Sequence, residues 1–265
     1  MYLNEHTASP GTKSIVSLVP SQTELLHYFG LEEEVVAITK FCIHPDEWFR
    51  SKIKIGGTKT IDVEKIKSLK PSLIIANKEE NVQSQVEALS PFSIWLTDVN
   101  NFEDALQMIT DLGNITGRSE QAAMLIEKIT QAFSKIPSNP NPLRVAYLIW
   151  KDPYMTIGGD TFISDMLTRT GIRNVFDSSK RYPEVSIDEI KTSGCELLLL
   201  SSEPFPFKQK NIDELSQQLP GITIKIVDGE MFSWYGSRLL KAAEYLKNLQ
   251  LGFLTDGTDV MDKHR

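Results

Sequence analysis

The residues of this 265-residue chain that could do chemistry are few, and they match no common catalytic motif. There are four histidines and two cysteines, and the sequence contains no phosphate-binding glycine loop, serine-nucleophile elbow, HExxH or CxxC pattern. His44 is the one well-placed imidazole, because His6 and His264 lie near the chain ends and His27 lies in a predicted helix. A catalytic triad or a metal site would have to be built around His44 with Cys42 and distant acids. A metal-assisted enzyme that uses His44 therefore stays open as one alternative.

Aromatic side chains gather in loops that follow predicted strands, at residues 41–48, 150–154, 181–183, 203–207 and 232–238. Open parallel sheets bind ligands outside the carboxyl ends of their strands, so rings in these loops suit a bulky, flat organic ligand. Trp150, Tyr182 and Trp234 are candidate ligand contacts, together with Arg238 at the end of the last loop. The alternative is that rings are part of the core, and it applies most to Trp95, which stands in an apolar run.

Acidic residues at strand exits form a second candidate set. Glu79 and Glu80 follow one predicted strand, and Glu203 follows another. A single carboxylate at such a position is ordinarily only solvated. Acids at equivalent positions of two repeated units can instead dock a partner that offers basic sockets.

The elements that must position these residues repeat along the chain. Segment 62–76 predicts a short helix, a turn and a buried strand, and segment 186–200 repeats the pattern 124 residues later. At this offset Glu64 is equivalent to Asp188, and Glu79 to Glu203. Chance similarity between two amphipathic units is the alternative, but the shared register favours two similar α/β lobes with parallel sheets.

The beginning of the first lobe has a clear local pattern. The apolar, β-branched run 14–19 predicts a buried strand that ends at Pro20. Residues 21–24 match a capping box and predict the start of a helix that runs to about Phe29, with Gly30 as its stop. Residues 35–38 predict the next strand.

A long helix is predicted between the lobes. Apolar positions in residues 118–136 follow the helical period, and the proline-rich stretch 137–142 ends the helix. At about 1.5 Å per residue such a helix spans ~28 Å, enough to connect two lobes. The predicted organisation is a lobe at 13–117, a linking helix at 118–137 and a lobe at 142–250, with a loose arm before residue 13 and a frayed tail after Leu251.

Composition excludes several classes of protein. The formal net charge of −7 argues against a nucleic-acid partner, since proteins that bind nucleic acid present a basic surface. No apolar run is long enough to span a membrane, and two distant cysteines cannot form a disulfide framework. The first residues show neither the basic nor the apolar region of a signal peptide, which leaves a cytoplasmic location open.

Segments 15–24, 41–45, 55–57, 64–76, 182–186 and 233–238 together resemble the substrate-binding proteins of cobalamin and ferric-siderophore ABC transporters. The order and spacing of the segments carry the resemblance, since no single motif is specific. It implies a class III substrate-binding protein, with two lobes joined by one backbone helix and the ligand held between them. The residues it places around the ligand are Pro20, Ser21, His44, Asn77, Tyr154, Tyr182, Ser233 and Trp234.

The same resemblance implies a monomeric, non-enzymatic protein with no intrinsic cofactor, in the periplasm or cell envelope. The expected ligand is a corrinoid such as cobalamin, or else a ferric siderophore or haem, and His44 could be an axial ligand to its metal. The expected partner is an ABC permease. Its docking acid in the second lobe is Asp188, and the first-lobe position falls on Gln83, near Glu79 and Glu80. A cytosolic corrinoid carrier or sensor is the alternative binding function.

Overall fold

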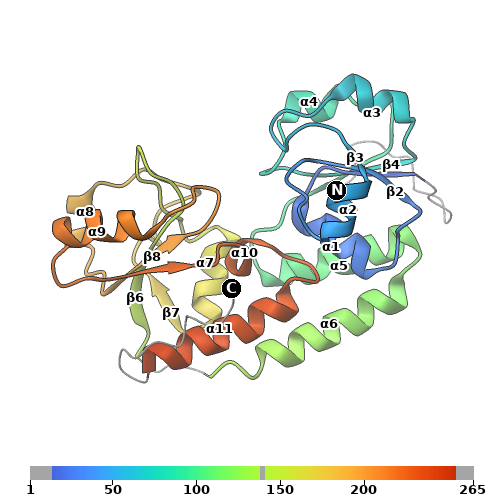
Figure 1. The fold of residues 1–265 in the computed structure, drawn as a ribbon. Coiled ribbons are helices and arrows are strands. Elements are labelled where there is room, and N and C mark those ends of the chain that lie inside the picture. Colours follow the sequence, from blue (N-terminus) through green and yellow to red (C-terminus); the bar gives the residue numbers. More distant parts are fainter. Residues whose placement is uncertain (1–13, 138–140, 255–265) are drawn as a thin grey trace. The chain divides into compact units, whose positions relative to one another are not determined.

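The computed structural model describes residues 14–137 and 141–254, which divide into two compact units (Figure 1). Unit 1 contains the described residues up to Val99, together with Glu103–Lys128 and Trp234–Arg238. Unit 2 contains Asn100–Phe102, the described part of Ile129–Ser233, and the described residues from Leu239 onward. The predicted arm before residue 13 and most of the predicted frayed tail lie outside the described residues. None of the described helices has the length and apolar character needed to cross a membrane.

The described residues of unit 1 form a parallel sheet with helices on both faces. The strands are β1 (Ile15–Ser17), β2 (Val35–Ile38), β3 (Ile53–Lys54), β4 (Leu73–Asn77) and β5 (Ile94–Thr97), in the order β3-β2-β1-β4-β5. The helices are α1 (Pro20–Tyr28), α2 (Asp46–Ser51), α3 (Val63–Leu69), α4 (Gln83–Glu87) and α5 (Phe102–Thr116), together with the first part of α6 (Ser119–Phe133), which ends in unit 2. The direction of winding changes between β1 and β4, which defines the topological switch point of this sheet.

Alternation along the strands explains how unit 1 buries both faces of its sheet. Val16 and Ile74 share one core cluster with Ile66 of α3 and Val86 of α4. Figure 1 shows α3 and α4 side by side on that face of the sheet. Since neighbouring strand residues such as Ile75 are also fully buried, the strands read as continuous apolar runs, as parallel strands covered on both sides do.

Unit 2 repeats this architecture. Its strands are β6 (Leu143–Leu148), β7 (Ile172–Asn174), β8 (Leu197–Ser201) and β9 (Thr223–Val227), all parallel in the order β7-β6-β8-β9. Its helices are α7 (Phe162–Arg169), α8 (Ile187–Thr192), α9 (Gln209–Gln218), α10 (Glu230–Ser233) and α11 (Leu239–Leu254). This order matches β2-β1-β4-β5 of unit 1, and β8 begins and ends 124 residues after β4. The prediction of two similar α/β lobes with parallel sheets is confirmed.

Two local predictions need correction. The chain passes from unit 1 to unit 2 within α6, between Lys128 and Ile129, but α6 is shorter at both ends than the predicted linking helix. The predicted capping box is wrong, because α1 already begins at Pro20 and the side chain of its N-cap residue, Val19, makes no capping hydrogen bond. The predicted end of this helix is right, with Gly30 at φ +69° just beyond it.

Candidate functional site

The carboxyl ends of β1 and β4 flank the switch point of unit 1, where ligands of open α/β sheets bind. Pro20 and Ser21 follow β1 and form the first turn of α1, both with buried side chains. Asn77 ends β4 and is also buried. Its Oδ1 accepts hydrogen bonds from the backbone of Glu79 (2.8 Å) and Glu80 (3.1 Å), while its Nδ2 donates to another side chain in the sheet. Asn77 therefore shapes the turn after β4.

The structure brings His44, Trp234 and Arg238 together in unit 1. His44, half-buried in the loop after β2, meets the ring of Trp234 edge-on, with ring centroids 5.4 Å apart and planes at 72°. The guanidinium of Arg238 lies 5.0 Å from the centroid of the Trp234 ring. Arg238 Nε donates a hydrogen bond of 2.8 Å to Glu24 Oε2 on α1. Three residues predicted for the ligand site thus form one continuous cluster.

Phe41, at the start of the same loop, is an exposed aromatic ring beyond the predicted ligand contacts. Its side chain is 51% exposed, with the ammonium of Lys40 5.2 Å from the ring centroid. The ring rests on Gly57, where a Cβ would lie only 3.1 Å from it. The aromatic character of loop 41–48 was the signal in the sequence, and exposure is what distinguishes Phe41 within that loop.

The predicted aromatic residues of unit 2 lie on two loops that backbone contacts join. Met155 forms bridges with Trp150 and with Glu184, and the N–H of Val185 donates to the carbonyl oxygen of Tyr154 at 2.9 Å. These contacts bring the Trp150–Tyr154 loop against the loop that carries Tyr182. Trp150 is 40% exposed, whereas Tyr154 and Tyr182 are half-buried.

Ser233 and Glu203 bind each other within unit 2. Ser233 Oγ is 2.8 Å from Glu203 Oε1 and 2.9 Å from the carbonyl oxygen of Gly229, so its hydroxyl donates within this group. Glu203 is half-buried, and its backbone N–H contacts Ser201 Oγ at the end of β8. This carboxylate is therefore held inside the unit rather than extended into solvent.

The predicted docking acids differ sharply in exposure. The side chain of Asp188 on α8 is 89% exposed. Glu79 and Glu80 are half-buried, and burial raises the pKa of Glu80, an effect that Lys59 partly offsets. An exposed carboxylate is a better docking group than one that burial tends to protonate.

Glu64 on α3 is the structural counterpart of Asp188. Each is the second residue of its helix and pairs with a lysine three positions later, at 3.1 Å for Glu64–Lys67 and 3.4 Å for Asp188–Lys191. The side chain of Glu64 is 83% exposed. The internal repeat contained this signal, although the predicted docking set did not include Glu64.

Cys42 is a buried structural thiol. Its Sγ contacts the hydroxyls of Thr23 (3.1 Å) and Thr39 (3.2 Å), and burial raises its pKa. Within the part of the chain that the structure describes, no three His, Cys, Asp or Glu side chains are grouped so as to hold a metal ion.

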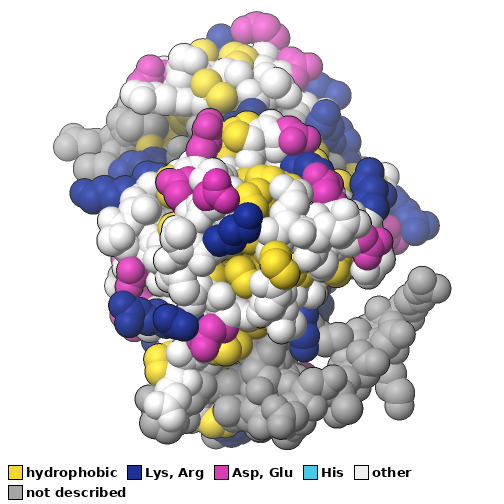
Figure 2. Space-filling model, turned by 90° about the vertical axis from the view of Figure 1, so that its left-hand side faces the viewer, with side chains coloured by type: hydrophobic (Ala, Val, Ile, Leu, Met, Phe, Trp, Pro, Cys, Tyr) yellow, Lys and Arg dark blue, Asp and Glu magenta, His cyan; other side chains and the backbone are white. Residues whose placement is uncertain are grey.

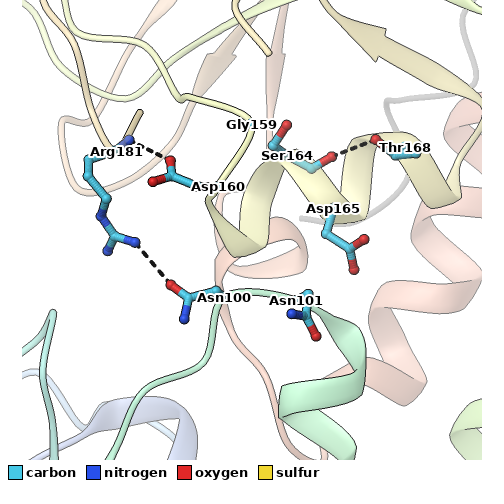
Figure 3. A pocket seen from close by; sticks show the side chains of 8 residues that line it. All are labelled: Asn100, Asn101, Gly159, Asp160, Ser164, Asp165, Thr168 and Arg181. Atoms are coloured by element: carbon cyan, nitrogen blue, oxygen red, sulfur yellow. Dashed lines mark hydrogen bonds between the residues drawn. The ribbon is translucent and has the colours of Figure 1, made fainter. Parts of the chain in front are cut away.

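A polar pocket of about 500 Å³ lies in unit 2 beside the first turn of α7. Figure 3 shows the Arg181 side chain reaching toward Asn100, with Nη1 2.9 Å from Asn100 Oδ1. The backbone N–H of Arg181 donates to Asp160 Oδ1 at 2.6 Å. On the opposite side Asp165 Oδ2 accepts from the N–H of Phe102 at 2.8 Å. None of the predicted ligand residues lines this pocket, whose polar groups hold the Asn100–Phe102 stretch in unit 2.

Two repeated α/β units with aromatic side chains at their strand ends are the features of a solute-binding protein. Residues 15–222 match the family model described as "Periplasmic binding protein", so the chain belongs to that family. The vitamin B12-binding protein of Pectobacterium carotovorum is 26% identical over 252 residues, which cover 92% of this chain and 90% of that protein. The vitamin B12-binding protein of Yersinia pestis is 26% identical over 242 residues, covering 88% of this chain and 84% of that one.

Solved structures confirm the predicted fold. The periplasmic vitamin B12-binding protein BtuF of Vibrio cholerae superposes with a TM-score of 0.78 at 21% identity, covering 94% of this chain and all of BtuF. The periplasmic haem-binding protein RhuT from Roseiflexus, in its apo form, gives a TM-score of 0.75 at 20% identity, covering 92% and 98% of the two chains. The family and the fold are those of solute-binding proteins, as the resemblance implied.

Proposed function

We propose that this protein binds a corrinoid such as cobalamin at the periplasm or cell envelope and delivers it to an ABC permease. The observation that carries the proposal is the cluster of His44, Trp234 and Arg238 in unit 1, with exposed Phe41 at the start of the loop that carries His44. Full-length similarity to vitamin B12-binding proteins supports the choice of ligand. Trp150, Tyr154 and Tyr182 of unit 2 are proposed as further ligand contacts.

Flat aromatic faces account for how such a ligand would be held. Burial of apolar surface contributes about 25 cal/mol per Å², so the faces of Phe41 and Trp150, which are 51% and 40% exposed, offer much of the available energy. Part of that energy offsets the cost of ordering ligand and side chains.

His44 is proposed as an axial nitrogen ligand to the metal of the bound chelate. Its imidazole is half-buried beside Trp234, which would orient the ring without removing it from solvent. The H44A variant should change the visible spectrum of bound aquocobalamin, whereas H27A should not, because His27 pairs with Glu47 on α2 at 2.7 Å. An unchanged spectrum in H44A would reject the axial role and leave the binding function standing.

Asp188 is proposed to dock the permease, together with Glu64 at the equivalent position of unit 1. Both carboxylates extend into solvent, whereas Glu79, Glu80 and Glu203 are half-buried and are not used in this proposal. Figure 2 shows the face that carries α8 and α9, where acidic and basic side chains are interspersed. On such a mixed surface, specific charge pairs rather than a broad negative field would orient the partner.

The decisive experiment is calorimetric titration of the purified protein with cyanocobalamin, haemin and a ferric hydroxamate siderophore in parallel. We expect one cyanocobalamin per chain and weaker or no binding of the other two. Binding of haemin alone would refute the corrinoid assignment and keep the transport class. Binding of none would remove the proposed function.

A further inference from the structure

We infer that Glu24 is a positioning residue of the ligand site, which fixes the ring of Trp234 through the guanidinium of Arg238. The inference rests on the proposed function in one respect, because it takes Trp234 and His44 to contact the ligand. Glu24 acts through its partner and need not touch the ligand. Its assigned role is to fix the orientation of a ligand-facing ring.

The segment Trp234–Arg238 belongs to unit 1, although the residues on both sides of it in sequence belong to unit 2. It lies close against α1. Gly236 has φ +93°, and a Cβ at this position would lie 3.3 Å from Leu25 Cβ and 3.5 Å from the carbonyl oxygen of Ser21. The backbone of the segment is thus seated on the helix that carries Glu24.

The ion pair at the end of this segment is buried. The side chains of Arg238 and Glu24 are 4% and 14% exposed, and their Nε and Oε2 atoms are 2.8 Å apart. A buried guanidinium needs its carboxylate, because removal of one partner leaves an uncompensated charge away from water. Glu24 therefore determines where the Arg238 side chain can lie.

Arg238 transmits this constraint to the aromatic cluster. Its guanidinium lies 5.0 Å from the centroid of the Trp234 ring, within the range of a cation–π contact. The Trp234 ring in turn meets His44 edge-on at 5.4 Å. A continuous series of contacts therefore connects Glu24 on α1 to two rings that are proposed to face the ligand.

The experiment compares E24Q with a matched control, E34Q. Glu34 pairs with Arg118 in the same unit at 3.3 Å, with side chains 27% and 29% exposed, and neither belongs to the proposed ligand site. Cyanocobalamin affinity is measured by calorimetry. The environment of Trp234 is measured as the difference in fluorescence between each protein and its W234F counterpart. We expect E24Q to bind about tenfold more weakly and to shift the Trp234 emission to longer wavelength, with E34Q within about twofold of wild type in affinity and unshifted.

Each outcome decides the inference. A folded E24Q protein with unchanged affinity and unchanged Trp234 emission overturns it. If E24Q does not fold, the E24M/R238M double variant replaces the buried pair with apolar side chains. A shift of the Trp234 emission to longer wavelength in that folded variant supports the positioning role, and an unshifted emission overturns it. If the wild-type protein binds no cyanocobalamin, the proposed function fails, and the Trp234 emission of E24Q alone decides the inference.

Discussion

Replacement of Gly236 by alanine tests whether the Trp234–Arg238 segment must be held against α1 for ligand binding. Gly236 has φ +93°, a region that residues with a Cβ rarely adopt, and a new Cβ would contact Leu25 and Ser21. The strained backbone conformation costs about 1–3 kcal/mol. The contact with Leu25 adds to this cost, because that side chain is fully buried and cannot move aside freely.

The free-energy cost of the substitution can appear in two ways. Either the whole unit becomes less stable, or the segment moves off α1 and carries Trp234 with it. Gly221 separates these effects, since it has a similar φ of +89° in unit 2, and a Cβ there would have no atom of the described residues within 4 Å. G221A therefore introduces similar backbone strain in the other unit and without a steric contact.

Urea unfolding and cyanocobalamin titration of both variants give the required comparison. We expect both to lower the urea midpoint, G236A more than G221A. We expect G236A alone to weaken ligand binding, by about tenfold if the released strain is near 1.4 kcal/mol. Equal affinities for G236A and G221A, in proteins that are both folded, would refute the reasoning that seating of this segment on α1 matters for the ligand.

Three further predictions follow from exposure and from the pKa shifts. The E64A/D188A variant should keep its ligand affinity but bind the permease about tenfold more weakly at low salt, as measured by stimulation of the permease ATPase. A loss of affinity that does not depend on salt would argue against docking by charge. Burial raises the pKa of Tyr245 from 10 to about 12, so its neutral form stabilises the fold, and this stability is lost as the pH rises from about 10 to 12. The urea midpoint of the wild-type protein should therefore fall more steeply over this pH range than that of Y245F. Because burial raises the pKa of both Cys42 and Cys195, neither thiol should react with Ellman's reagent in the native protein, and both should react in urea; rapid labelling of the native protein would contradict their placement.

The repeat was readable from the sequence because its signal is local. In each copy a short amphipathic helix leads through a turn into a strand of continuous apolar residues, and parallel strands buried on both faces require that composition. The same register therefore places β4 and β8 at equivalent positions. The aromatic loop after β6 was equally readable, since Trp150 stands beside turn residues in the sequence, whereas Trp234 directly follows helix α10 rather than a strand.

The sequence misled where a neighbouring proline or a distant partner decides the local structure. Residues 21–24 fit a capping box, but Pro20 already occupies the first turn of α1 and Glu24 binds Arg238, 214 positions away. No local pattern reveals that a carboxylate is committed to such a tertiary ion pair. The sequence likewise places Asn77 near the ligand without revealing that its hydrogen bonds hold the turn after β4.

Duplication itself helps to separate the acids that stay within a unit from those that a partner can reach. Glu79 and Glu203 are equivalent, and in both units the residue that ends the strand binds the backbone N–H of the acid, which stays half-buried. Glu64 and Asp188 are also equivalent, and in both units the acid extends from the first turn of a short helix and pairs with a lysine three positions later. Exposed pairs of this kind contribute little to stability, so stability does not explain why the arrangement occurs in both units. Recognition of a partner by charge, as proposed for Glu64 and Asp188, would explain it, because two acids fix orientation better than one.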